Sequence, residues 1–125
     1  MAHVVEEESG YELSHVKLLQ PKLRLSMMKH AVVHPQPMVL NIHDVMPGHF
    51  HSDTAFAFLV NGEPTKLLGE GESNDIRWMT MSEIDALSDD DIYQNVREAS
   101  HFIVDNFSEW ELVDPMEYSL EKRKI

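Results

Sequence analysis

The sequence contains no cysteine, so the chain can form no disulfide bond, no thiolate metal site and no thiol nucleophile. Basic residues are also scarce, because 10 Lys and Arg stand against 22 Asp and Glu, and the formal net charge is −12. Such a surface repels phosphate backbones, which excludes nucleic acid as a bulk partner. A small phosphorylated ligand remains compatible with this charge if a cation screens the carboxylates.

Long apolar runs and targeting segments are missing as well. No stretch approaches the roughly 20 apolar residues that a membrane helix needs. The acidic residues 1–10 lack the apolar centre of a signal peptide. We therefore expect a cytoplasmic protein with no membrane partner. At 125 residues and 42% hydrophobic composition, the chain suits one domain that spans residues 1–125.

Hydrophobic patterning predicts short strands in the first two thirds of the chain. The candidate strands cover residues 15–19, 27–33, 37–45, 54–60, 65–68 and 75–79. The run 54–60 (TAFAFLV) is apolar on both faces, which predicts a central strand that is covered on both sides. The pair Asn61-Gly62 predicts a tight turn directly after this strand.

Two helices are expected after these strands. Thr80 and Glu83 form a T-x-x-E capping box, which predicts a short helix through Leu87. Residues 88–91 suit the start of a second helix. Its apolar stripe recurs every three or four residues at Ile92, Val96, Ala99, Ile103 and Phe107.

The order of these elements, strands first and helices after, indicates the fold class. We expect an α/β or α+β domain in which helices flank a mixed β-sheet. The tail from Ser108 receives no assignment, and residues 121–124 are expected to be solvated.

The first ten residues read as the end of a helix that stops at Gly10. If residues 3–9 are helical, Val4, Glu7 and Glu8 share one face, because positions i, i+3 and i+4 are neighbours. Two adjacent carboxylates suit a hard divalent cation such as Mg²⁺, which prefers oxygen ligands. A solvated acidic helix end is the alternative interpretation of these glutamates.

The string AHVVEEESGY at residues 2–11 resembles the end of the Nudix box, GX5EX7REUXEEXGU, in which U is a bulky apolar residue. Glu7 and Glu8 fill its paired glutamate positions. Gly10 and Tyr11 fill the final glycine and apolar positions. The resemblance implies that Glu7 and Glu8 bind a divalent metal ion.

The string departs from the box at two positions and lacks its beginning. His3 stands where the box has Arg, and Val4 stands where it has its first Glu. The glycine-containing loop has no counterpart, so we expect a Nudix-like domain without its first strand or strands and without the start of the Nudix helix. Half a box with one glutamate replaced should hold a metal poorly, which predicts weak or absent turnover.

Residues 75–87 (DIRWMTMSEIDAL) carry a second resemblance to Nudix domains. There, a strand bearing a Trp precedes a cap residue and a short helix, and Trp78 fits that strand and is expected in the core. A glutamate usually stands shortly before this strand, and Glu70 and Glu72 occupy that loop here. A solvated acidic loop is the alternative reading of the two glutamates.

The resemblance implies a hydrolase that uses Mg²⁺ or Mn²⁺ to direct water at the pyrophosphate bond of a nucleoside diphosphate linked to another moiety. It implies Glu7, Glu8 and Glu70 as metal ligands, and Glu8 and Glu72 as catalytic residues. The alternative is a catalytically inactive binding or interaction domain on the same fold. The missing strands would leave sheet edges exposed, which predicts a homodimer that covers them.

A second metal hypothesis concerns His49, His51 and Asp53, which point to one side of an extended chain. Two imidazoles and a carboxylate can hold a transition metal, and the surrounding PGHFH resembles part of a cupin motif. That resemblance implies a cupin-like His-metal protein. The Glu that a cupin site needs after the second His is absent, and so is the second cupin motif with its own His. We therefore prefer the interpretation that these histidines occupy polar surface positions and strand edges.

Overall fold

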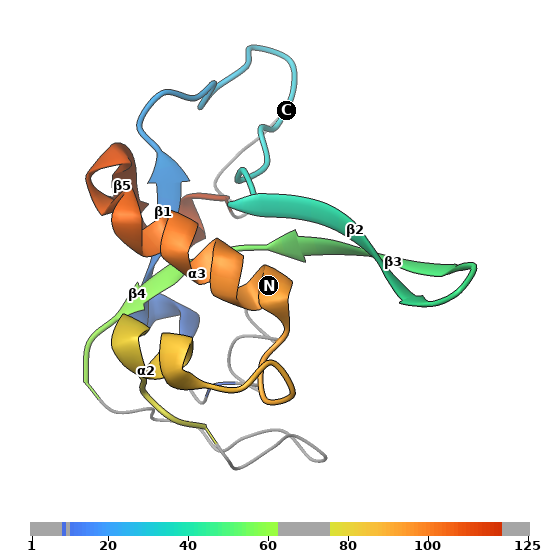
Figure 1. Ribbon diagram of the computed structural model, residues 1–125. Helices are drawn as coiled ribbons and strands as arrows, with labels where there is room; N and C mark the ends of the chain where they lie inside the picture. The colour runs from blue at the N-terminus through green and yellow to red at the C-terminus, as the bar shows by residue number, and fades with distance from the viewer. Residues whose placement is uncertain (1–8, 10, 63–75, 119–125) are drawn as a thin grey trace.

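The structure is a computed structural model that describes residues 9, 11–62 and 76–118 (Figure 1). These residues combine helices with antiparallel strands, which confirms the α+β class. The strands are β1 Val16–Pro21, β2 Val39–Met46, β3 His49–Ala55, β4 Phe58–Val60 and β5 Trp110–Val113. The helices are α2 Met81–Ala86 and α3 Gln94–Asp105, with 3-10 turns η1 Leu13–His15, η2 Phe107–Glu109 and η3 Pro115–Tyr118.

A three-stranded antiparallel sheet with the order β4-β1-β5 holds the core. Leu18 of the central strand β1 pairs with Phe58 on one side and Val113 on the other, and its side chain is fully buried. Val16 and Leu19 of the same strand are also buried. Full burial of such an apolar side chain contributes about 1.5–3 kcal/mol, so β1 anchors the fold.

Gln20 is the buried polar residue of β1, and its amide binds a neighbouring segment. Its Nε2 donates to the carbonyl of Gln36 at 2.8 Å, and its Oε1 accepts from the Gln36 N–H at 2.8 Å. Both polar atoms of the buried amide therefore have hydrogen-bond partners. The amide pairs with the backbone of Gln36 much as a neighbouring strand would. This contact holds the chain that leads into β2 against β1.

Strands β2 and β3 form a separate antiparallel hairpin that extends away from the three-stranded sheet (Figure 1). Gly48 in its turn has a φ of +79°, which glycine adopts without steric cost. One face carries Leu40, Ile42 and Phe50, whose exposed fractions are 68%, 73% and 64%. The hairpin therefore presents three exposed apolar side chains on one face, beside Asp44, Ser52 and Thr54, and nothing in the described part of the chain covers them.

The prediction of one central strand over residues 54–60 is wrong. The segment divides after Ala55, where β3 ends its pairing with β2, and β4 then pairs with β1 as an edge strand. Between the two strands, the Ala57 carbonyl accepts from the Leu19 N–H at 2.9 Å. The chain stays extended while it changes partner, and an apolar pattern carries no signal of such a change.

Other strand predictions have mixed outcomes. Those at 15–19 and 37–45 are confirmed as β1 and β2 with shifted ends, while 27–33 holds only an isolated Met28–Ala31 bridge. Residues 76–79 form no strand, and Trp78 is 74% exposed, so its expected core position is wrong.

Residues 65–68 lie outside the described residues, and the unassigned tail supplies β5. All strand pairings among the described residues are antiparallel, so the predicted mixed sheet is not found there.

The capping box at the start of α2 is confirmed. Thr80 Oγ1 accepts from the Glu83 N–H at 3.2 Å, and the Glu83 carboxylate accepts from the Thr80 N–H at 3.1 Å. The predicted start of the second helix is wrong, because residues 88–91 form a turn and α3 begins at Gln94. Within the described ranges, neither helix is long and apolar enough to cross a bilayer.

Candidate functional site

The glutamates expected to bind metal or act in catalysis, Glu7, Glu8, Glu70 and Glu72, all lie outside the described residues. What the structure does describe is the chain immediately beside them. Ser9 is helical, whereas Tyr11 is not.

Tyr11 lies three positions after Glu8 and contacts two residues that flank positions 63–75. Its side chain is only 6% exposed, and its hydroxyl donates to the carbonyl of Gly62 at 2.7 Å. Its ring meets Trp78 edge-on, with centroids 6.4 Å apart and planes at 81°. Gly62 directly precedes residues 63–75 and Trp78 shortly follows them, so the contacts of Tyr11 lie on both sides of the sequence that contains Glu70 and Glu72.

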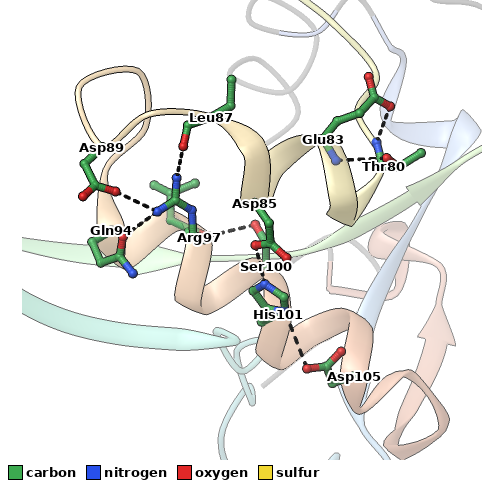
Figure 2. A network of polar contacts seen from close by, with 11 residues as sticks. Thr80, Glu83, Asp85, Leu87, Asp89, Gln94, Arg97, Ser100, His101 and Asp105 are labelled. Atoms are coloured by element: carbon green, nitrogen blue, oxygen red, sulfur yellow. Dashed lines mark hydrogen bonds and ion pairs between the residues drawn. The ribbon is translucent and has the colours of Figure 1, made fainter.

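A second group of polar side chains joins α2 to α3, and Arg97 lies at its centre (Figure 2). The guanidinium donates to the Leu87 carbonyl at 2.7 Å and to Asp89 and Gln94 at 2.9 Å each. Its side chain is 13% exposed, so these contacts are largely shielded from water. The planar donor geometry of Arg suits several acceptors at once, and it fixes the turn between the helices.

His101 completes this network on the exposed side (Figure 2). Its Nε2 lies 2.7 Å from Asp85 of α2, and its Nδ1 lies 3.7 Å from Asp105 of α3. The hydrogen bond with Asp85 raises the pKa of His101, and the charges of both carboxylates act in the same direction. The contact with Asp85 therefore links α3 to α2, and protonation of His101 strengthens it. The i, i+4 spacing to Asp105 is visible in the sequence, whereas Asp85 lies on another helix.

Of the three residues in the alternative metal hypothesis, His49 and His51 lie together and Asp53 contacts a different histidine. His49 and His51 lie with their Nε2 atoms 3.2 Å apart and their ring centroids 5.1 Å apart. The Asp53 carboxylate instead contacts Nδ1 of His43 at 3.2 Å, and His43 lies opposite His51 in the hairpin register. Among the described residues, no three His, Asp or Glu side chains are arranged to hold a metal ion together.

His43 is the member of this cluster that the sequence interpretation missed. It stands on β2, and the alternation of Asn41 and His43 places both on the face that also carries His51 and Asp53. The sequence does show that the polar residues Asn41 and His43 alternate with apolar residues along this segment. This alternation becomes informative only when the register of the hairpin is known.

Comparisons with known proteins assign no family to this chain. No protein-family model, no curated protein and no solved structure matches it. The functional proposals therefore rest on the residues of the chain itself and on their contacts.

Proposed function

We propose that the protein is a Nudix-type hydrolase that cleaves the pyrophosphate bond of a nucleoside diphosphate linked to another moiety, with Mg²⁺ or Mn²⁺. The sequence basis is the resemblance of residues 2–11 and 75–87 to Nudix motifs. The structural observation that supports it most is the pair of contacts made by Tyr11. Tyr11 fills the apolar position that closes the motif, and it is buried, as that position requires.

Only a few residues of chain separate the proposed site residues Glu8 and Glu72 from the aromatic residues Tyr11 and Trp78. Glu8 precedes Tyr11 by three residues, and Glu72 precedes Trp78 by six. An extended chain spans at most about 3.6 Å per residue, which limits these separations to about 11 Å and about 22 Å. Because Tyr11 and Trp78 are in contact, both segments can supply ligands to one cation.

The donor set fits a hard divalent cation, since all the proposed ligands are carboxylates. Glu7, Glu8 and Glu70 would hold the ion, which when bound lowers the pKa of water and screens the phosphate oxygens. Glu8 and Glu72 would orient the attacking water and accept its proton. The water oxygen forms a bond to phosphorus, the bond from phosphorus to the bridging oxygen breaks, and two phosphorylated products leave.

We expect the turnover to be low because Val4 occupies the position of one glutamate in the motif. A site with fewer carboxylates holds the cation less firmly, so fewer molecules are loaded at a given metal concentration. Val4→Glu should restore that carboxylate and raise the rate. This gain would not follow from a general change in surface charge, for which Lys17→Glu on β1 is a control at an exposed position.

The test is product formation from a panel of nucleoside diphosphate derivatives with Mg²⁺ or Mn²⁺, followed by chromatography. We expect slow, metal-dependent cleavage that is lost in Glu8→Gln and retained in Glu6→Gln, because position 6 lies off the proposed ligand face. If neither the wild type nor Val4→Glu forms product, the hydrolase proposal fails. A catalytically inactive binding domain would then remain, and calorimetry with the same nucleotides would test it.

We also propose that two copies associate through the apolar face of the hairpin, which carries Leu40, Ile42 and Phe50. An isolated two-stranded hairpin is at best marginally stable in water, so a covering partner would stabilise it. Residues 39–55 hold only 2 of the 22 acidic residues and no Lys or Arg. One of these two, Asp44, lies opposite Phe50, so the proposed contact face carries a single charged residue, and interface cores are poor in charged residues.

A further inference from the structure

We propose that His49 and His51 form a binding site for one divalent transition-metal ion at the outer end of the β2–β3 hairpin. Its donors are imidazole nitrogens, which favour Zn²⁺, Ni²⁺ and Cu²⁺ over Mg²⁺. The site shares no residue with the carboxylates of the proposed hydrolase. It would therefore be a second metal site of different chemistry, and its existence does not depend on the proposed activity.

The distance between the two rings carries the argument. Nε2 of His49 lies 3.2 Å from Nε2 of His51. A metal ion binds imidazole nitrogen at about 2.0–2.1 Å, so neighbouring ligands stand about 2.8–3.0 Å apart in octahedral geometry and about 3.3–3.4 Å apart in tetrahedral geometry. An ion equidistant from both nitrogens would subtend an angle of about 100°, between the octahedral and tetrahedral values.

The tautomers available to the pair are compatible with a metal ion at this position. A neutral imidazole has one N–H donor and one lone-pair acceptor, so two Nε2 lone pairs at this distance repel each other. A proton between the nitrogens of His49 and His51 removes that repulsion through an N–H···N hydrogen bond. A metal ion at the same place removes it by binding both lone pairs, with each ring protonated at Nδ1.

The hairpin holds the two rings in place. His49 and His51 are two positions apart on β3, so their side chains leave the same face of the strand. His49 directly follows the turn that contains Gly48, and His51 pairs with His43 across the hairpin. Both histidines are exposed, so water or a second molecule can complete the coordination of the ion.

His43 is a positioning residue in this arrangement. Its Nδ1 lies 3.2 Å from the Asp53 carboxylate and 3.2 Å from Asn41 Oδ1, which orients the ring. The ring then meets His51 edge-on, with centroids 6.0 Å apart. Support of this kind typically affects metal affinity without supplying a ligand. The overall negative charge further favours cation binding, and the hairpin carries no Lys or Arg to oppose it.

The experiment is calorimetric titration of the full chain with Zn²⁺ alone, alongside histidine ring signals followed by NMR. We expect one ion per hairpin, with shifts confined to the rings of His43, His49 and His51. His49→Asn and His51→Asn should each weaken Zn²⁺ binding at least about tenfold. Mutation of a residue that only supports a ligand already lowers metal affinity by roughly 10–100-fold, and loss of a ligand should cost at least as much. His15→Asn, an exposed histidine outside the hairpin, should leave the affinity unchanged.

Two further variants separate this site from other sources of binding. His43→Asn should weaken Zn²⁺ less than either ligand variant, and Glu8→Gln should leave Zn²⁺ binding at the hairpin intact. The proposal is overturned if His49→Asn and His51→Asn bind Zn²⁺ as the wild type does. It is also overturned if Glu8→Gln removes the binding, because the glutamates would then hold the ion. Circular dichroism of each variant verifies that the fold is retained.

Discussion

Replacing Tyr11 with Phe removes one hydrogen bond and keeps the ring beside Trp78. The bond runs from a phenol that is 6% exposed to the Gly62 carbonyl at 2.7 Å. A neutral hydrogen bond contributes about 0.5–1.5 kcal/mol net. Because Gly62 is exposed, water can replace the lost donor. We therefore expect Tyr11→Phe to lower the free energy of unfolding by about 1 kcal/mol, without the larger penalty of an unsatisfied buried group.

A larger substitution at the same position provides the comparison. Tyr11→Leu also removes the aromatic contact, which contributes about 0.5 kcal/mol, at the low end of the usual range. That low value follows because Trp78 is 74% exposed and the centroids are 6.4 Å apart. Tyr11→Leu should therefore destabilise the protein more than Tyr11→Phe. The measurement is urea unfolding followed by circular dichroism, with comparable denaturant slopes in all variants.

Tyr93→Phe is the matched control, because Tyr93 is 79% exposed and should lose no stability with its hydroxyl. If Tyr11→Phe unfolds at the same urea concentration as Tyr93→Phe, the Tyr11–Gly62 hydrogen bond does not contribute and the reasoning is refuted. If the proposed site exists, the same variants should also lower metal-dependent turnover, since Tyr11 contacts Gly62 and Trp78 on either side of residues 63–75. Loss of stability without any loss of turnover would limit Tyr11 to a structural role.

Three further predictions concern the helices and the hairpin. Thr80→Ala removes the N-cap of α2 and should cost about 1 kcal/mol in urea unfolding, and an unchanged midpoint would contradict the cap. The raised pKa of His101 means that its stabilisation is complete below a pH of about 6.5 and is lost as the pH rises through the raised value. Asp85→Asn should flatten this decline in unfolding free energy, and an equal decline in both proteins would argue against the contact. Leu40→Asp should give monomers by light scattering while Leu23→Asp, at a position 95% exposed outside the hairpin, should not. A wild type that is monomeric throughout the micromolar range would end the dimer proposal.

Features that depend on neighbouring residues were predictable from the sequence. The capping box of Thr80 and Glu83 involves positions three residues apart, so its pattern contains the whole interaction. The backbone N–H of Thr80, with its hydroxyl adding to the effect, lowers the pKa of Glu83, as expected for a carboxylate at a helix start. The strand β1 was also predictable, because three of its buried residues, Val16, Leu18 and Leu19, are apolar, whereas the burial of the polar Gln20 was not.

Features that depend on distant partners were not predictable in this way. Residues 54–60 look like one strand, but they change from β2 to β1 as partner, and hydrophobicity does not identify a partner. Strand β5 has only four residues, and its pairing with β1 defines it. In the candidate site, the burial of Tyr11 agrees with the apolar position that the resemblance gives it, whereas its contacts with Gly62 and Trp78 connect distant parts of the chain.

The central claim is that Glu8 and its companion carboxylates hold a hard divalent cation beside Tyr11. The most direct measurement is Mn²⁺ titration followed by amide NMR, because the paramagnetic ion broadens nearby signals. The signals of Tyr11, Gly62 and Trp78 should broaden first at low Mn²⁺, and Glu8→Gln should abolish the effect while Glu6→Gln preserves it. Broadening spread evenly over the acidic surface, or unchanged in Glu8→Gln, would contradict the claim.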